Sequence, residues 1–258
     1  MTTAFGSALK DWRTRRRLSQ LELALRAGTT QRHVSFMESG RSVPGRGMVV
    51  RVAESLQLPL RERNALLLSA GYAPTYPETD LSDPALRPVL DALERLLDGH
   101  EPYPAIVVDR FGDLVAINKA AGILTEGAAP ELLEPPVNVL RLALHPRGMA
   151  PRIVNFDDWA RHVLERPRQE QAKAPHPRHA ELLAELESYL PGPPNLDADH
   201  LGFAVPLVLR TSRGEMRLLT AITTFATAVD VTVSELRLET FLPADDETAH
   251  IFTGQRAQ

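Results

Sequence analysis

SQLELALRAGTTQRHVSFMESGRSVP, residues 19–44, predicts two short helices joined by a tight turn. Gly28 stands where the end of a helix needs a residue that tolerates positive φ, and Thr29 and Thr30 follow as candidate N-caps of the next helix. Apolar residues at helical spacing form one seam on each helix: Leu23, Ala24, Ala27, Val34 and Met37. Because the two seams can close on each other, the stretch is typical of a helix-turn-helix.

Four residues remain on the outer side of the second helix: Gln31, Arg32, Ser35 and Phe36. Gln can pair twice with adenine, Arg can pair twice with guanine, and an apolar ring can touch a thymine methyl group. Each good bidentate pair contributes roughly 1–3 kcal/mol of discrimination between bases. Any surface helix can carry Gln, Arg and Ser, so these residue types do not by themselves distinguish a DNA-reading helix from a solvated one.

The segments RRRLSQLELA, AGTTQRHVSFMESGRSVP and VVRVAESLQL resemble the phage-repressor (Xre-type) helix-turn-helix family over residues 5–70. This resemblance implies a five-helix domain whose third helix enters the major groove. By position it implies that Gln20 anchors a phosphate, and that the residues facing DNA are Thr30, Gln31, Arg32, Ser35 and Phe36. Phe36 departs from relatives that carry a polar residue there, which leaves open whether this position makes an apolar contact or none.

The same resemblance implies two further features of the head. Arg41 and Arg46 lie in a loop that resembles the family's backbone-contacting loop, so we expect Arg41 to touch phosphate. Arg13 and Glu38 occupy the places of a partly buried salt bridge. An isolated ion pair is weak evidence for stability, but removing one partner leaves a buried charge uncompensated and is costly.

Composition limits the possible classes of protein. The chain has 258 residues, and its hydrophobic content of 43% is enough for two ordinary domains. It contains no cysteine, which excludes disulfides, thiolate metal sites and cysteine nucleophiles. No apolar run approaches the roughly 18 residues of a membrane span, and the N-terminus lacks a signal-peptide pattern. We expect a cytoplasmic protein that does not insert into membranes and needs neither metal nor cofactor.

Charge is divided unevenly along the chain. Residues 1–71 hold 12 Lys and Arg against 5 Asp and Glu, a net charge of +7, whereas residues 72–258 carry −11. A basic head with an acidic body is expected of a protein whose head binds nucleic acid and whose body faces another partner. Charge asymmetry also has other causes, so it supports this interpretation only modestly.

A domain boundary is predicted at the proline-rich segment YAPTYPETDLSDP, residues 72–84. We therefore predict a DNA-binding domain at 1–71, a linker at 72–84 and a second domain at 85–258. The second domain begins with an amphipathic helix over 85–98, which could cover its own domain or contact a second subunit. A hairpin follows at 105–118, and Asn118 is expected to cap the next helix rather than to contact a ligand.

The remaining elements alternate between helices and strands. Helices are predicted near 137–144, 157–166 and 178–189, and strands at 203–211, 215–225 and 235–242. The order of two strands, several helices and three strands predicts an α+β, PAS-like domain, in which helices cover one face of an antiparallel sheet and leave a cavity between them.

The segments EPYPAIVVDRFGDLVAIN, PPVNVLRLALHPRGMAPRIVNF and VDVTVSELRLETFLPAD resemble the C-terminal domain of MmyB-like transcription regulators, over roughly residues 85–245. With the helix-turn-helix, the resemblance extends over nearly the whole chain. It implies that the second domain senses a small apolar or fatty-acid-like ligand, without implying which one.

Candidate ligand-binding residues lie on one predicted helix and one strand. Asn138, Arg141 and His145 gather beside an apolar stripe, where they could hold a carboxylate head group. Arg141 could equally be a salt-bridged surface residue, and His145 could simply end the helix. Phe225 adds a ring at the end of a Thr-rich strand, although Thr is also a common strand former.

Motifs of enzymes are missing from the sequence. It contains no H-E-x-x-H, G-x-S-x-G, P-loop or G-x-G-x-x-G pattern, and His176 and His179 lie in a proline-rich connector that we interpret as surface. We therefore predict a ligand-responsive transcription regulator that binds a double-stranded DNA operator as a homodimer and is not an enzyme. The alternative is a constitutive DNA-binding protein whose second domain serves only in dimerisation or protein docking.

Overall fold

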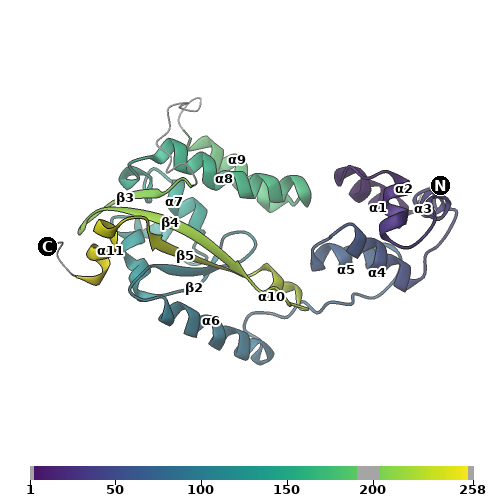
Figure 1. Ribbon diagram of the computed structural model, residues 1–258, viewed down its shortest axis with the longest axis horizontal. Helices are drawn as coiled ribbons and strands as arrows, with labels where there is room; N and C mark the ends of the chain where they lie inside the picture. Colours follow the sequence, from purple (N-terminus) through teal and green to yellow (C-terminus); the bar gives the residue numbers. More distant parts are fainter. Residues whose placement is uncertain (1–2, 191–203, 255–258) are drawn as a thin grey trace. The chain divides into compact units, whose positions relative to one another are not determined.

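The computed structural model describes residues 3–190 and 204–254. The chain forms two compact units: residues 1–80 with 227–234, and residues 81–226 with 235–258. The first unit is helical and the second combines an antiparallel sheet with helices (Figure 1), so the predicted α+β class is confirmed. The boundaries at 71 and 84 stay predictions, and the likeness to PAS domains stays a resemblance.

In residues 3–80 the first unit contains five helices: α1 (Ala4–Arg15), α2 (Gln20–Arg26), α3 (Gln31–Glu38), α4 (Arg46–Ser55) and α5 (Leu60–Ser69). They bury one apolar core, to which α1 contributes Leu9, α2 Leu23 and α3 Val34 and Met37. The predicted inner seams of the helix-turn-helix therefore do meet.

Local signals set the ends of α2 and α3. Ser19 and Glu22 form a reciprocal capping box at the start of α2. Gly28 adopts a φ of +61° in the turn, a conformation in which a side chain would be strained. Thr30 caps α3 by accepting a hydrogen bond from the backbone N–H of His33. The turn residues therefore act as their types predict.

The segment after α5 is held by side chains of the first unit. The Asn64 Oδ1 accepts hydrogen bonds from the backbone N–H groups of Thr75 and Tyr76, at 3.0 and 3.1 Å. Further along, Thr79 donates to Asp230 Oδ2 through its backbone N–H at 3.1 Å and its hydroxyl at 2.6 Å. Asp230 belongs to the 227–234 segment that joins β4 to β5, so the chain beyond α5 is fastened to a residue from near the C-terminus.

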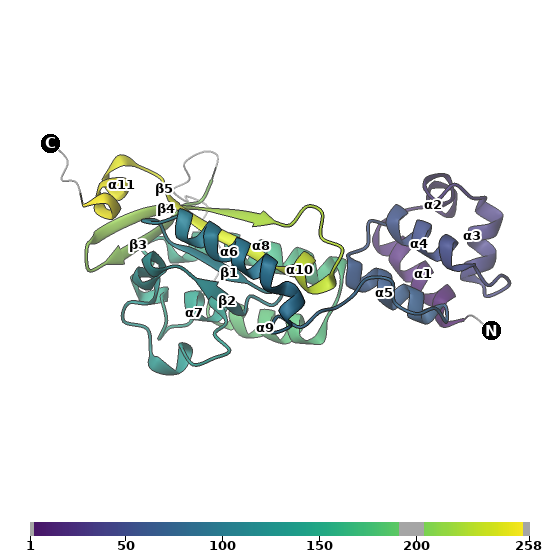
Figure 2. The same cartoon turned by 90° about the horizontal axis from the view of Figure 1, so that it is seen from below.

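The second unit is built on a five-stranded antiparallel sheet in the order β2-β1-β5-β4-β3 (Figure 2). Its strands are β1 (Ala105–Val108), β2 (Leu114–Ile117), β3 (Leu207–Thr211), β4 (Gly214–Thr224) and β5 (Arg237–Pro243). Its α-helices among the described residues are α6 (Arg87–Gly99), α7 (Val139–Leu144), α8 (Phe156–Lys173), α9 (Pro177–Ser188) and α11 (Asp246–Thr253). Helix α10 (Val231–Glu235) precedes β5, and most of its residues belong to the first unit. Within the described part of the chain, 3-10 helices lie at Pro84–Leu86, Lys119–Thr125, Pro130–Leu132 and Ala150–Arg152.

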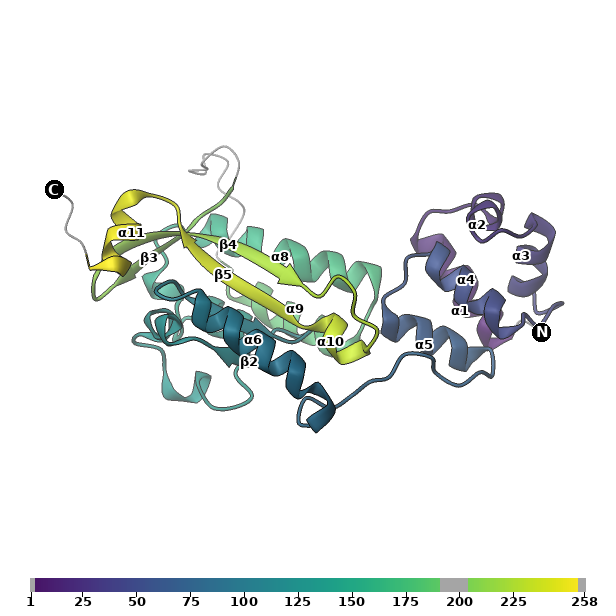
Figure 3. The ribbon, with the colours of Figure 1, turned by 60° about the horizontal axis from the view of Figure 1, so that its bottom comes forward.

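Helices cover both faces of the sheet. Figure 3 shows α6 in front of the sheet and α8 and α9 behind it. Leu93 and Leu97 of α6 pack with Val107 and Leu238 on one face, so α6 covers its own domain, the first of the two readings of the amphipathic helix. The other face supplies Ile106 and Phe241 to a larger core. Residues that alternate along a strand thus serve two separate cores.

The predicted role of Asn118 as an N-cap is confirmed. Its Oδ1 accepts from the backbone N–H of Ala121 at 3.1 Å and from that of Ala105 at 3.0 Å. The element that it caps is a 3-10 helix, Lys119–Thr125, rather than an α-helix.

Two expectations from the sequence are wrong. The helix expected to end near residue 166 runs on to Lys173 through Pro167, although a proline removes a backbone hydrogen bond inside a helix. Arg166 and Glu170 lie on either side of Pro167, and each forms an ion pair with a residue of β5. These ion pairs support the continued helix. His179, interpreted as a surface residue, is buried against Phe111, because α9 turns this side inward.

We expect Arg13→Met to lower the free energy of unfolding of the first unit by about 3 kcal/mol, because it leaves the Glu38 carboxylate buried without its cation. Arg13 Nε donates to Glu38 Oε1 at 2.6 Å, and the Glu38 side chain is only 5% exposed. Urea unfolding followed by circular dichroism measures the change. Lys10→Met is the matched control because Lys10 is an exposed cation of the same helix, and equal effects of both substitutions would contradict the prediction.

Candidate functional site

The outer side of α3 offers polar groups to a partner. Gln31 and Arg32 are exposed, while Ser35 and Phe36 are half-buried. Thr30 is exposed at the helix N-terminus, where its hydroxyl caps α3. The structure therefore brings the five DNA-facing candidates of α3 together on and beside one helix face.

Phe36 lies between two arginines. The guanidinium carbon of Arg32 is 5.0 Å from the centre of the Phe36 ring, and that of Arg41 is 5.8 Å from it. Both distances allow cation–π attraction. Arg41 is exposed in the loop after α3, so the ring joins a candidate base reader to the candidate phosphate contact. Both guanidinium groups thus lie within cation–π range of one ring.

Gln20 is tied into the buried salt bridge. Its Nε2 donates to Glu38 Oε2 at 2.8 Å, and Arg13 Nη2 donates to the same oxygen at 3.1 Å. The ion pair implied by the family resemblance is confirmed. An amide nitrogen carries two hydrogens, so Gln20 can donate to Glu38 and still offer one hydrogen to a phosphate at the start of α2.

A second site lies in the C-terminal unit, where a cavity of about 650 Å³ separates the sheet from the helices. This volume is within the roughly 300–1,000 Å³ typical of ligand sites. The wall from α8 consists of residues at helical spacing, Trp159, His162, Val163 and Arg166. The floor includes Ile106 of β1, Thr220 and Ile222 of β4, and Glu239 and Phe241 of β5. The cavity is therefore mostly apolar, with a few polar groups.

The register of the sheet explains this floor. Glu239 pairs with Ile106 on one side and with Ile222 on the other. Directly paired residues point to the same face of a sheet, so a carboxylate lies between two isoleucines. Ile222 is 45% exposed, so the described residues cover this part of the floor only partly.

Three predicted ligand-binding residues of α7 make contacts within the protein. Asn138 is buried and caps α7, and its Nδ2 donates to the carbonyl of Phe111 at 2.8 Å. Arg141 makes a two-pronged ion pair with Glu185 of α9, at 2.5 and 2.7 Å. His145 stacks edge-on against Tyr189. These residues fasten α7 to its neighbours.

Phe225, the fourth predicted ligand-binding residue, packs beside the core under α6. None of the four is among the described residues that line the cavity. A direct contact between any of them and a ligand stays a prediction.

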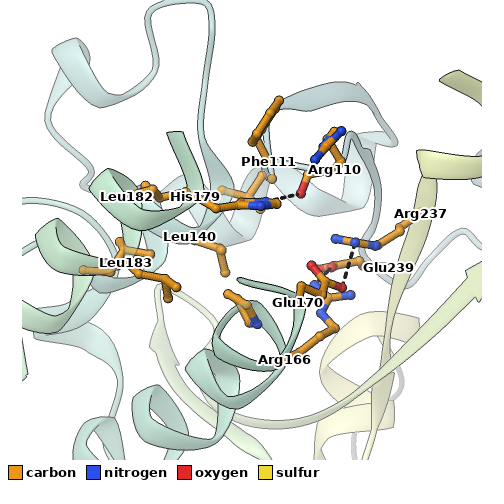
Figure 4. A pocket seen from close by; sticks show the side chains of 14 residues that line it. Arg110, Phe111, Leu140, Arg166, Glu170, His179, Leu182, Leu183, Arg237 and Glu239 are labelled. Atoms are coloured by element: carbon orange, nitrogen blue, oxygen red, sulfur yellow. Dashed lines mark hydrogen bonds and ion pairs between the residues drawn. The ribbon is translucent and has the colours of Figure 1, made fainter. Parts of the chain in front are cut away.

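Sequence reasoning missed Arg166 and Glu239, the charged pair of the cavity. Figure 4 shows Arg166 and Glu170 of α8 facing Glu239 and Arg237 of β5, seen in a small neighbouring pocket that shares Arg166 and Glu239 with the cavity. Arg166 Nη2 donates to Glu239 Oε1 at 2.9 Å, and Arg237 Nη2 donates to Glu170 Oε1 at 2.8 Å. The alternation in RLETF was an available signal, because it places Glu239 on the same face as the apolar Phe241.

His179 fastens α9 to the turn between β1 and β2 (Figure 4). Its Nε2 is 2.9 Å from the carbonyl oxygen of Arg110, and its ring packs 4.8 Å from that of Phe111. Burial lowers the pKa of His179 below its usual value. A neutral imidazole that donates to this carbonyl accounts for the contact, so His179 serves as a structural group.

Metal binding and membrane spanning find no support in residues 3–190 and 204–254. No group of three or more His, Asp or Glu side chains in these ranges is arranged to hold a metal ion. None of the helices described there is both long and apolar enough to cross a membrane.

Comparisons with known proteins match both halves of the chain to families. Residues 89–253 match the family model described as MmyB-like transcription regulator ligand binding domain, and residues 9–63 match the model described as Helix-turn-helix. Both resemblances noted in the sequence are thereby confirmed. The matched families are domains of transcription regulators rather than enzymes. No curated protein matches the chain.

One solved structure, described as an RNA-binding Light-Oxygen-Voltage receptor, aligns with 98% of this chain at 17% identity and a TM-score of 0.23. The chain covers 61% of that receptor's length. A TM-score this low does not indicate a shared overall fold.

We expect Arg141→Gln to destabilise the C-terminal unit by up to about 1 kcal/mol at pH 7, because the ion pair with Glu185 is partly exposed. The hydrogen bond from Arg141 lowers the pKa of Glu185 below the ordinary value of 4.5. A lowered pKa gives stability that is complete above that ordinary value and is lost as the pH falls through the lowered one. The urea midpoints of the wild-type protein and of Arg141→Gln should therefore converge in acid.

Arg147→Gln is the control, because the Arg147 side chain is 66% exposed in its pair with Glu131. It should leave the midpoint unchanged at either pH. A difference for Arg141→Gln that persists in acid would show that Arg141 acts through something other than Glu185.

Proposed function

Because the chain belongs to the family of MmyB-like transcription regulators, we propose that it is a sequence-specific regulator whose C-terminal domain senses a small, fatty-acid-like ligand. The coarser statement, a DNA-binding regulator with a ligand-binding domain, follows from the two matched families. The finer statement rests on one observation, the apolar cavity of about 650 Å³ between the sheet and α8. An elongated apolar molecule suits this lining.

In this proposal α3 reads DNA. Gln31 and Arg32 contact base edges in the major groove, and Thr30, Ser35 and Phe36 line the same surface. Arg41 and Gln20 contact phosphates, which position the domain without specifying sequence. The exposure of Gln31 and Arg32 supports these roles, as does the packing of Arg32 and Arg41 on Phe36.

The regulator acts as a homodimer on a palindromic or repeated operator. Two heads then contact half-sites about one helical turn, roughly 34 Å, apart. The protein works in the cytoplasm, where its operator is found, without inserting into membranes and without catalysing a reaction. No cofactor is required, because the ligand itself is the signal.

Ligand binding shifts the protein between two states, which requires unequal affinity of the ligand for them. A route that combines the backbone with one hydrogen-bonded contact is available for this shift. Glu239 on the cavity floor belongs to β5, and β5 follows the 227–234 segment that is fastened to Thr79 through Asp230. A displacement of β5 would therefore act on the segment that leads out of the DNA-binding helices.

Gln31→Ala and Arg32→Ala should each reduce discrimination between matched and mismatched operators by about 1–3 kcal/mol at the base that they contact. Gln20→Ala should weaken binding to all sequences alike, since it removes a phosphate contact. Gel-shift titrations at one fixed salt concentration measure both effects. If Gln31→Ala and Arg32→Ala keep the wild-type sequence preference, α3 is not the reading helix.

Ile222→Trp should narrow the cavity at its floor and reduce retention of a co-purified apolar molecule, as measured by native mass spectrometry. Thr223→Trp is the matched control because the neighbouring residue points to the opposite face of β4. It should retain the molecule, and both variants should keep operator binding without ligand. Wild-type protein that carries no ligand and takes up none would instead support the alternative, a constitutive DNA-binding protein with a docking domain.

A further inference from the structure

The cavity contains one ion pair among its described lining residues, Arg166 on α8 and Glu239 on β5. The third ionisable residue of the lining, His162, has a side chain that is 56% exposed and lies beside Glu165. The Glu239 side chain is only 12% exposed, and its surroundings on the floor are Ile106 and Ile222. The pair is therefore the main polar feature that a ligand inside the cavity can reach.

This pair retains hydrogen-bonding capacity. The hydrogen bond within the pair runs from Nη2 of Arg166 to Oε1 of Glu239. Nη1 of Arg166 is buried and has no hydrogen-bond partner among the described residues. Arginine carries five N–H donors, and the Arg166 side chain as a whole is 33% exposed, so a ligand reaches it from the cavity through its exposed part rather than through the buried Nη1.

The charge of the pair is already balanced. One guanidinium faces one carboxylate, and the neighbouring Arg237 and Glu170 balance each other in the same way (Figure 4). A ligand carboxylate placed here would add a second anion beside Glu239 without a second cation in the lining. In a cavity of low dielectric constant, such an uncompensated charge is costly.

We propose that the cavity selects an apolar chain that ends in an uncharged group able both to donate and to accept hydrogen bonds, such as a primary amide or a hydroxyl. The group accepts from Arg166 and donates to Glu239. This inference rests on the proposed function and narrows its ligand class: the molecule has the tail of a fatty acid but not the ionised head.

The test compares decanamide with decanoate, which share one chain and differ in head group. Binding to the full-length protein is measured by isothermal titration calorimetry at about pH 8, where a carboxylic acid is ionised. We expect decanamide to bind about tenfold more tightly, since a charge mismatch of this kind is worth at least one decade of affinity. Equal or tighter binding of decanoate would overturn the inference.

Glu239→Gln should reverse the preference by about tenfold toward decanoate, because it leaves the Arg166 cation without its carboxylate. Glu170→Gln is the matched control: it removes an equal charge from the adjacent pair, and Glu170 is not among the cavity-lining residues. This control should keep the wild-type preference. Reversal by both substitutions, or by neither, contradicts the assignment of Glu239.

Thermal unfolding shows whether Glu239→Gln folds. If it does not, the double variant Arg166→Gln/Glu239→Gln removes both charges together and should still prefer decanamide. A preference of that variant for decanoate would overturn the inference. Failure of both probes to bind wild-type protein would remove the cavity as a site for decyl amphiphiles, and with it the proposed sensing function. Tighter binding of decanoate would remove only the head-group inference.

Discussion

The alternation of side chains along β5 organises the C-terminal unit. β5 is the middle strand of the sheet, and its pleat sends successive residues to opposite faces. Leu238 therefore packs under α6, while Glu239 and Phe241 face the cavity and α8. A slip of one residue would bring Glu239 against Leu93 and Leu97. Because an unpaired buried carboxylate is costly, the register that forms the core also sets the chemistry of the cavity.

A comparable constraint holds the DNA-binding head. Glu38 at the end of α3 accepts hydrogen bonds from Arg13 of α1 and Gln20 of α2. One carboxylate thus joins three helices while the core packs on their other sides. The network fixes α3 relative to α2, so Gln31 and Arg32 stay outward. The Phe36 ring lies within cation–π range of both Arg32 and Arg41.

Local rules were sufficient for much of the structure. Capping residues, a glycine at positive φ and helical spacing are properties of short stretches, and they predicted the helix-turn-helix and the cap at Asn118. The same applies to the succession of strands and helices along the chain, which predicted the α+β class, because each apolar run is bounded by turn residues. The families named for the two halves were also recognisable from short motifs.

The sequence by itself therefore determined the class of each domain, the outward face of α3 and the division of charge between head and body. Only the tertiary structure decided which polar residues face the cavity. Arg141 and His145 suit a ligand site by residue type, yet α9 supplies their partners, Glu185 and Tyr189. Arg166 and Glu239 lie 73 positions apart and meet at the cavity. Such pairings depend on how α8 and β5 pack, because distance in space is not encoded in any one stretch of chain.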